Sequence, residues 1–390
     1  MPVLNRIAEV APEIAEWRRD LHRHPELLFD LDRTSAVVAD RLRGFGFDAV
    51  VTGLGRTGVV GVLHGRSGPG GRAVALRADM DALPIQEITG APWASTTAGK
   101  MHACGHDGHT AMLLGAARHL AETRAFEGTV IFVFQPAEEG GGGAKAMIDD
   151  GLFDRFRIDE IYGLHNMPGL DVGRFAIRPG PIMAAADRFG IAISGRGGHA
   201  AKPQETIDPV LVGAHVVTAL QSIVSRTVDP LRAAVVSVTC FNAGTTDNVI
   251  PHTANLSGTV RALDPTVRQT VEAKLHHVVR TTAEVFGAEA TVTYRRGYPV
   301  TVNDPAAAAF AADVARRIVG DGAVAEDADP MMGAEDFSYY LERKPGAFIF
   351  MGNGPSAGLH HPAYDFDDTA IAYGTSWWVT LAEAALARGG

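Results

Sequence analysis

Cysteine is scarce in this sequence. The 390 residues include only Cys104 and Cys240, which lie far apart, and Cys104 stands among histidines. Small folds that are held together by disulfides carry several cysteines within a short chain. A disulfide framework is therefore excluded, and we expect the protein to work in a reducing compartment, the cytoplasm.

Basic runs and long apolar runs are also missing. The net charge is −10 and no cluster of Lys and Arg stands out, so neither nucleic acid nor an anionic membrane surface is an expected partner. No apolar stretch approaches the ~18 residues of a membrane span, and residues 1–19 lack the layout of a secretory signal. The expected partner is a small molecule.

The length and the order of patterns predict an α/β protein. A chain of 390 residues exceeds what one hydrophobic core usually supports, so two domains are expected. Apolar residues spaced by three or four predict a helix over 5–23, and strand-like runs follow at 59–63, 73–77 and 129–134. This alternation favours a mostly parallel sheet that is flanked by helices.

A different pattern begins near Asp187. The expected elements run in the order strand, helix, strand, strand, helix, strand, over residues 188–194, 207–226, 233–241, 254–263, 265–286 and 290–295. This order is the split βαβ unit of ferredoxin-like folds. We therefore predict an α+β satellite domain at 187–296, inserted into a catalytic domain that is formed by 1–186 and 297–390.

The chemically reactive motifs of the expected catalytic domain follow strands. They are Asp79 and Asp81 after strand 74–77, Glu138 and Glu139 after strand 130–134, and His165 after strand 161–164. In parallel α/β sheets, ligands bind at the carboxyl ends of the strands. We expect these side chains to gather at one edge of the sheet.

Residues 101–109, Met-His-Ala-Cys-Gly-His-Asp-Gly-His, place a thiol, three imidazoles and a carboxylate close together. Thiolate and imidazole groups suit Zn, Co, Ni or Mn when a carboxylate is also present. Cys104 and His106 are two residues apart, so they can converge on one ion from a strand end or a loop but not from a helix. The stretch predicts a metal site.

The pair Glu138-Glu139 fits hydrolysis at such a site. One carboxylate can bind metal while its neighbour takes a proton from metal-activated water. His165, with His360 or His361, can complete the ligand set. Because this set is larger than one tetrahedral ion needs, it predicts two metal ions ~3.5–4 Å apart.

Each motif taken alone also has a purely structural interpretation. A single cysteine is commonly a small buried apolar residue, a single histidine is commonly a hydrogen-bonded surface or core residue, and two adjacent glutamates are usually a solvated pair. The combination of all of them in one chain favours the metal site.

A series of motifs resembles the M20 metallopeptidase family. The motifs are 21–26 (Leu-His-Arg-His-Pro-Glu), 77–84 (Arg-Ala-Asp-Met-Asp-Ala-Leu-Pro), 104–109 (Cys-Gly-His-Asp-Gly-His), 136–142 (Pro-Ala-Glu-Glu-Gly-Gly-Gly), 163–166 (Gly-Leu-His-Asn), 195–200 (Gly-Arg-Gly-Gly-His-Ala), 333–337 (Gly-Ala-Glu-Asp-Phe) and 359–362 (Leu-His-His-Pro). The resemblance runs from about residue 15 to 377. It is closest to the branch of hippurate hydrolases, N-acyl-amino-acid amidohydrolases and auxin-conjugate hydrolases, and it implies a catalytic α/β domain with a ferredoxin-like satellite.

The resemblance also implies roles for individual residues. It makes Glu138 the general base, and it makes five residues the ligands of two divalent ions, namely Cys104, His106, Glu139, His165 and His360. His360 is preferred to His361 because the family pattern is Leu-His-Asn/Ser-Pro. The identity of the ions, Mn²⁺, Zn²⁺, Co²⁺ or Ni²⁺, stays open.

Further roles concern the surroundings of the metal site and the satellite domain. We assign Asp79, Asp81 and Asp107 to hydrogen bonds that orient the ligands. In the family, a histidine equivalent to His199 reaches a neighbouring subunit and polarises the scissile carbonyl, which implies a homodimer or homotetramer formed through the satellite domain. Asn248 and Arg261 resemble the residues that hold the substrate carboxylate in the family.

These assignments predict a metal-dependent amidohydrolase that cleaves N-acyl or N-aroyl amino acids such as hippurate. Two alternatives within the family are a dipeptidase or carboxypeptidase and a diaminopimelate-type deacylase. An alternative of another class is a non-catalytic protein that binds metal or amino acids. The presence of Glu138 argues against that last alternative, because a binding protein has no need of a base beside the ligands.

Overall fold

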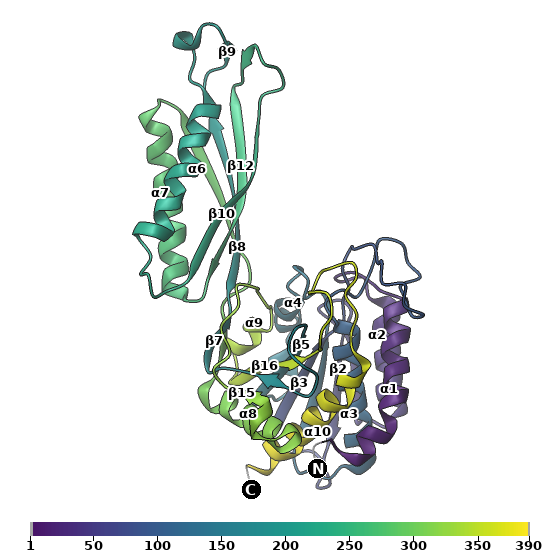
Figure 1. The fold of residues 1–390 in the computed structure, drawn as a ribbon. Coiled ribbons are helices and arrows are strands. Elements are labelled where there is room, and N and C mark those ends of the chain that lie inside the picture. The colour runs from purple at the N-terminus through teal and green to yellow at the C-terminus, as the bar shows by residue number, and fades with distance from the viewer. Residues whose placement is uncertain (1–2, 389–390) are drawn as a thin grey trace. The chain divides into compact units, whose positions relative to one another are not determined.

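The computed structural model describes residues 3–388, and these divide into two units (Figure 1). Unit 1 contains residues 3–180, 302–329 and 336–388, and unit 2 contains 181–301 and 330–335. The chain passes between the units in β7 (Gly180–Met183), in β14 (Thr301–Asn303) and on either side of residues 330–335. The boundaries expected from the sequence, 187 and 296, fall inside unit 2.

Unit 1 is built on an eight-stranded sheet. In spatial order its strands are β1 (Ala49–Leu54), β2 (Gly58–His64), β4 (Thr129–Gln135), β3 (Ala73–Asp79), β5 (Glu160–Met167), β16 (Gly346–Gly352), β6 (Phe175–Ala176) and β15 (Val324–Ala325). The four central strands, from β4 to β16, are parallel to one another, whereas β1 is antiparallel to β2, β2 to β4, and β6 to β16. The parallel centre confirms the predicted α/β class.

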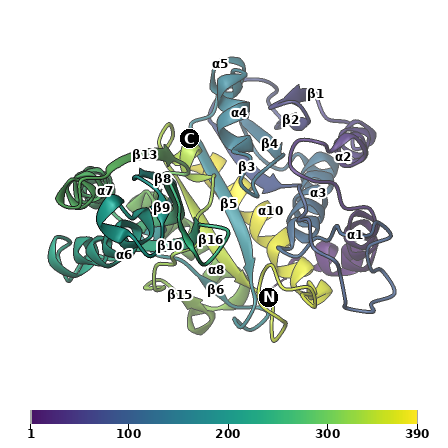
Figure 2. The same ribbon diagram turned by 90° about the horizontal axis from the view of Figure 1, so that it is seen from above.

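The helices of unit 1 cover the sheet on both faces. They are α1 (Asn5–Arg23), α2 (Asp32–Gly44), α3 (His106–Thr123), α4 (Gly143–Asp149), α5 (Leu152–Arg155), α8 (Pro305–Val319), α9 (Ser338–Leu341) and α10 (Ile371–Ala387), with short 3₁₀ turns at η2 (Asp321–Ala323) and η3 (Asp368–Ala370). Helix α10 packs on α1, α3 and α8, whereas α4 packs on α5 and α9. Figure 2 shows α3 and α4 on either side of β3 and β4. Every residue of β3, β4 and β16 is buried, as expected for strands that are covered twice.

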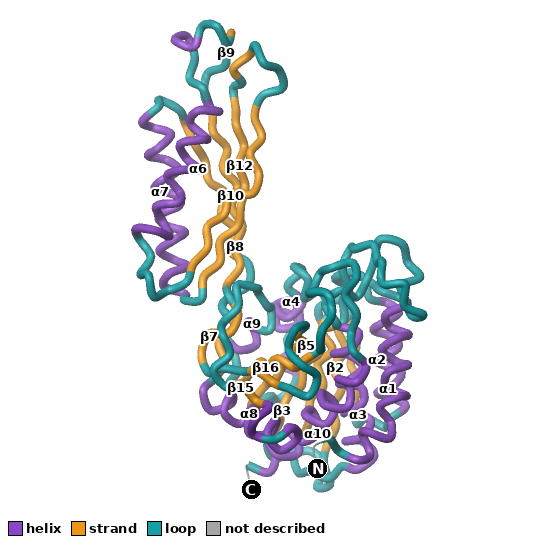
Figure 3. The backbone as a smooth tube through the Cα atoms, viewed as in Figure 1, coloured by secondary structure: helices purple, strands orange, loops and turns teal. Residues whose placement is uncertain are grey.

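Unit 2 has the predicted order of elements. Its strands β8 (Ala185–Ser194), β10 (Ala234–Ala243), β12 (Thr253–Ala262) and β13 (Glu289–Arg296) form an antiparallel sheet in the order β10-β12-β8-β13, joined by α6 (Pro209–Arg226) and α7 (Pro265–Val285). Both helices lie along one face of this sheet (Figure 3). Residues of β8 alternate between buried and more exposed, which fits a sheet with one covered face. The remaining short elements are β9 (Gly198–His199), η1 (Pro203–Glu205) and β11 (Val249–Ile250).

Three of the long helices start at the same local signal, an Asp-Pro pair. Asp208, Asp264 and Asp304 each accept hydrogen bonds from the first backbone N–H groups of α6, α7 and α8. The proline that follows has no N–H to leave unpaired in the first turn. These starts can be identified in the sequence because the signal is local. Within residues 3–388, no helix is both long enough and apolar enough to cross a membrane.

Candidate metal centre and active site

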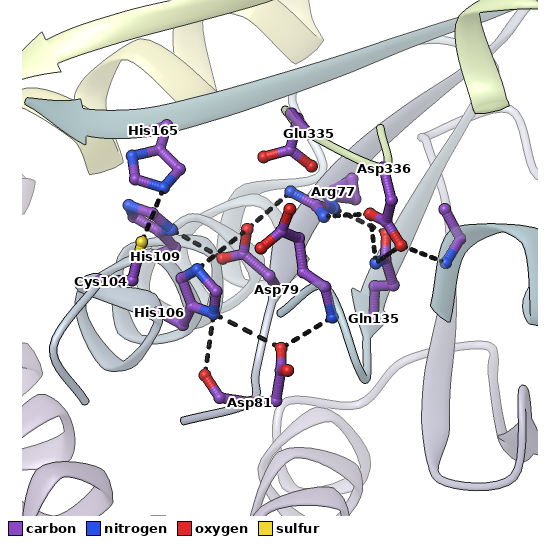
Figure 4. Close-up of polar contacts among 12 residues, drawn as sticks. Arg77, Asp79, Asp81, Cys104, His106, His109, Gln135, His165, Glu335 and Asp336 are labelled. Atoms are coloured by element: carbon purple, nitrogen blue, oxygen red, sulfur yellow. Dashed lines mark hydrogen bonds and ion pairs between the residues drawn. The ribbon is translucent and has the colours of Figure 1, made fainter. Parts of the chain in front are cut away.

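The carboxyl ends of the central strands gather the polar motifs, as predicted. Asp79 is the last residue of β3, Glu138 and Glu139 follow the end of β4, and His165 lies near the end of β5. Because β3, β4 and β5 are parallel, these ends lie at the same edge of the sheet (Figure 4). His165 is part of β5 rather than of the loop that was expected after it.

Gly105 turns the chain between two predicted ligands. His106 is the first residue of α3, so the expectation that it lies on a strand end or loop is wrong. Gly105 precedes the helix with φ +86°, a left-handed conformation that suits glycine. Cys104 therefore lies outside the helix, so the helical geometry that would point residues two apart in different directions does not separate it from His106.

Replacing Gly105 by alanine is expected to disturb the metal site as well as the local backbone. An added Cβ would lie 2.2 Å from Asn166 Nδ2 and 2.6 Å from the Tyr364 hydroxyl. The left-handed φ costs about 1–3 kcal/mol, and overpacking adds a similar amount. Thermal unfolding should shift to lower temperature, and metal content should fall because Asn166 Nδ2 also donates to the Cys104 carbonyl at 2.6 Å.

Gly46→Ala is the matched control for Gly105→Ala. Gly46 has φ +79°, and nothing lies within 4 Å of its added Cβ. It therefore carries the backbone strain without the clash. Equal losses of stability and metal content in both variants would show that the clash between the added Cβ and Asn166 does not cause the loss.

The donor atoms of the predicted ligands form overlapping groups. These groups are Cys104–His106–His165, Cys104–Glu139–His360 and His106–Glu138–Glu139, and within each group the donor atoms lie within 4.8 Å of one another. Cys104 Sγ is 3.4 Å from His165 Nε2, and Glu139 Oε1 is 3.3 Å from His360 Nε2. The structure thus brings together all five residues that were expected to bind metal.

Two of the histidines are held in the orientation that ligands need. His106 Nδ1 lies 2.8 Å from the Asp81 carbonyl oxygen, and His165 Nδ1 lies 2.7 Å from the Asn166 carbonyl oxygen. A carbonyl only accepts, so each Nδ1 carries a proton and each Nε2 is the ring nitrogen left for a metal ion. His106 Nε2 is buried and has no hydrogen-bond partner among the residues that the structure describes. This geometry fits coordination by Nε2.

The electrostatics of the cluster also fit divalent cations. Burial and the nearby carboxylates of Glu139 and Glu138 raise the pKa of Cys104 well above its usual range. Although burial opposes the charged form, the carboxylates of Asp79, Asp81 and Glu139 raise the pKa of His106 to about 10. A divalent cation would offset the negative charge of the carboxylates and replace the protons on the Cys104 thiol and the His106 ring. The residues present therefore fit a metal centre.

His360 and His361 are separated by the geometry of their loop. His360 has φ +64°, and its backbone N–H donates to the Ala103 carbonyl at 2.7 Å, next to Cys104. His361 is exposed, and its Nδ1 accepts from the Ala363 N–H at 3.0 Å. Of these two histidines, His360 is the one that lies beside Glu139 among the described residues.

Asp81 and Asp79 contact the cluster in the way expected of orienting residues. The two carboxylate oxygens of Asp81 accept the backbone N–H groups of Glu138 and Glu139 at 2.9 and 3.1 Å. Asp79 accepts from His109 Nδ1 at 2.7 Å. Despite complete burial, the positive charges near Asp79, of which His106 is the largest contributor, hold its pKa well below the usual range. Asp81 fixes the backbone on which both glutamates stand.

Asp107 does not have the expected role among the described residues. Its carboxylate lies 2.8 Å from His22 Nδ1 and 3.5 Å from Arg18, both on α1, and among the described residues it makes no hydrogen bond to a predicted ligand. Asp107 follows His106 in a helix, so the two side chains point about 100° apart. It attaches the start of α3 to α1.

Sequence reasoning gave no role to several residues around the site. His109 lies one helical turn after His106, and this spacing was a usable signal.

Arg77 is a charged residue in a fully buried strand, and a buried charged side chain needs partners of opposite charge or hydrogen-bond acceptors. The partner Asp336 had no such signal, because 258 residues separate the two in the sequence (77 to 336). Asn166 contacts both His109 and Cys104.

The predicted residues of unit 2 fall into two places. His199 in β9 pairs with Val249 in β11, and the Asn248 carbonyl accepts the Ala200 N–H at 3.1 Å, so His199 and Asn248 are close together. Arg261 lies near the other end of β12, about 26 Å from Thr253 at ~3.3 Å per residue. Within one copy of unit 2, the structure does not bring Asn248 and Arg261 together.

The sequence profile described as peptidase family M20/M25/M40 matches residues 75–384, which include the whole donor cluster. The chain belongs to this family. It is 42% identical over 382 residues to a hippurate hydrolase of Campylobacter jejuni, covering 98% of this chain and 99% of the relative. It is 44% identical over 355 residues to an N-acetyl-L-cysteine deacetylase of Bacillus subtilis, covering 91% and 83%.

A solved structure supports the same placement. A Bacillus subtilis protein described as a dinuclear metal-binding peptidase from the M20 family superposes with a TM-score of 0.85 at 36% identity, covering 97% of this chain and 99% of that one. Together with the donor cluster, these relatives show that the chain is a metal-dependent amidohydrolase of the M20 family.

Proposed function

We propose that this M20 amidohydrolase cleaves the amide bond of N-acyl and N-aroyl amino acids, hippurate among them, with two divalent ions held by the five-residue cluster. The observation that carries the proposal is the Glu138-Glu139 pair, which Asp81 fixes beside Cys104, His106, His165 and His360. The likeness to a hippurate hydrolase over nearly the full chain supports the choice of substrate.

The metal ions, when bound, would make water more acidic and polarise the substrate carbonyl. The other steps belong to residues of the chain. Glu138 takes the proton of the attacking water and returns it to the amide nitrogen as the carbon–nitrogen bond breaks, so the products are a carboxylic acid and an amino acid. Glu138 is 7% exposed, which limits competition from bulk water.

For unit 2 we carry over the family roles as proposals. His199 would polarise the scissile carbonyl of a substrate bound to a neighbouring subunit, which requires a homodimer or homotetramer formed through unit 2. Asn248 and Arg261 would hold the substrate carboxylate, and their positions at different ends of β12 mean that the two must come from different copies. Light scattering tests the assembly, since a monomer in solution excludes this arrangement.

A free buried thiol at Cys104 also leads us to propose a cytoplasmic location, because thiols are kept reduced there.

The test is amino-acid release from a substrate panel by chelator-stripped protein, before and after addition of Mn²⁺, Zn²⁺, Co²⁺ or Ni²⁺. Benzoylglycine comes first, followed by N-acetyl amino acids, a dipeptide and an N-succinyl-diaminopimelate. We expect metal-dependent release that is fastest for an N-acyl or N-aroyl amino acid. Faster cleavage of the dipeptide or the diaminopimelate conjugate would reassign the substrate class, and silence from protein that holds two ions would favour a binding role.

A further inference from the structure

Arg77 is the one charged side chain within the Val74–Ala78 stretch of β3, and its guanidinium is fully buried. It donates from Nε to Gln135 Oε1 at 2.9 Å, from one terminal nitrogen to Asp79 Oδ2 at 2.7 Å, and from the other to Asp336 Oδ1 at 3.1 Å (Figure 4). A buried charge with this many partners is fixed in one orientation.

The partners of Arg77 are themselves fixed. Gln135 Nε2 donates to both carboxylate oxygens of Asp336 at 2.8 and 3.0 Å, and the Ala144 N–H at the start of α4 donates to Asp336 at 2.9 Å. Arg77 is therefore held between the ends of β3 and β4 and the segment that precedes α9. Its position cannot adjust freely when charges near Asp79 change.

The other oxygen of Asp79 is committed by His109. The Asn166 backbone N–H donates to His109 Nε2 at 2.9 Å, so Nε2 accepts and the ring proton is on Nδ1. That proton is donated to Asp79 Oδ1 at 2.7 Å. Asp79 is thus an ionised carboxylate whose Oδ1 is occupied by His109 and whose Oδ2 is occupied by Arg77.

Asp79 would otherwise be a competing metal ligand. Its Oδ2 lies 3.7 Å from His106 Nε2, the nitrogen expected to bind metal, and Asp79, His106 and His109 form a donor group of their own. An ionised carboxylate at this distance can coordinate the same ion as His106. It would draw the ion away from Cys104 and Glu139.

We propose that Arg77 is a positioning residue that keeps Asp79 out of the metal coordination shell and so directs His106 to share its ion with the Cys104 and Glu139 side of the cluster. The proposal rests on metal binding as described under the proposed function, but it does not depend on the identity of the substrate.

The test is a Co²⁺ titration of full-length protein with Arg77→Met, followed by absorption spectroscopy. Methionine keeps the bulk of the side chain and removes its charge. We expect the visible bands of bound Co²⁺ to change as Asp79 enters the coordination shell, and Co²⁺ affinity to fall about 10–100-fold, the range seen for residues that orient ligands. With an active substrate, kcat should fall while KM changes little.

Three comparison variants make the result specific. Arg118→Met removes a charge from the outer face of α3, where Arg118 pairs with Glu13 and Glu122, and should leave the Co²⁺ spectrum unchanged. Arg77→Lys keeps one charge and should recover part of the affinity. In the double variant Arg77→Met/Asp79→Asn, the competing carboxylate is gone, so the wild-type bands should return.

The proposal is overturned by a folded Arg77→Met protein whose Co²⁺ spectrum and affinity equal those of the wild type. If Arg77→Met does not fold, Asp79→Asn alone decides, because the proposal requires the Co²⁺ spectrum to survive that change. Loss of a bound ion in Asp79→Asn would make Asp79 a ligand and would end the proposal. A wild-type protein that binds two Co²⁺ ions but cleaves no panel substrate would contradict the proposed function and leave this inference standing.

Discussion

Glu138→Gln is expected to lower kcat by about 10²–10⁴-fold, the usual contribution of a general base. This loss corresponds to about 3–5 kcal/mol of transition-state stabilisation. Glutamine has the same shape but cannot take the proton of the attacking water. The Asp81 hydrogen bonds to the backbone of Glu138 and Glu139 do not involve the changed side chain, so the metal cluster should persist.

The measurement pairs steady-state hydrolysis with metal analysis of the same sample. Glu127→Gln is the matched control, since Glu127 is an exposed residue two positions before β4, and its turnover should equal that of the wild type. Turnover of Glu138→Gln within a few-fold of the wild type would remove Glu138 from the mechanism. Loss of bound metal in that variant would instead make Glu138 a ligand.

The gathering of the site at one edge of the sheet was predictable from the sequence. Strand periodicity located β3, β4 and β5, and parallel strands place their carboxyl ends together. Asp79, Glu138 and His165 therefore had to be close without knowledge of any side-chain contact. The split βαβ order predicted the sheet of unit 2 for a similar reason, because a short list of topologies fits six elements in that order.

Side-chain direction was less predictable. The sequence does not show that α3 begins at His106, so the angular relation between the residues of its first turn could not be predicted. Once His106 and Asp107 are both helical, they diverge, whereas His109 returns to the side of His106. Without that helix start, sequence reasoning gave an orienting role to Asp107 and none to His109.

Contacts between distant segments were not predictable at all. Asp336 reaches Arg77 and Gln135 from the segment before α9, and no spacing in the sequence relates these residues. The same holds for His22 of α1, whose ring lies beside Asp107. Such pairs depend on how elements pack, and packing direction is a property of the folded chain.

Cys104→Ala is expected to reduce metal affinity by at least ~100-fold, the upper end of what loss of an orienting residue costs. Cys104 belongs to two of the donor groups, one with His106 and His165 and one with Glu139 and His360, so its loss affects both ions. Amide hydrolysis should be abolished at micromolar metal. The intense near-ultraviolet band that a thiolate gives with Co²⁺ should disappear.

Cys240→Ala is the natural control for Cys104→Ala, because these are the two cysteines of the sequence. Cys104 is buried in the metal cluster, whereas Cys240 is exposed on β10 of unit 2. Cys240→Ala should keep metal content, turnover and the thiolate band. If the band survives in Cys104→Ala and vanishes in Cys240→Ala, the thiolate ligand is Cys240, and the cluster at the end of β5 is not the metal centre.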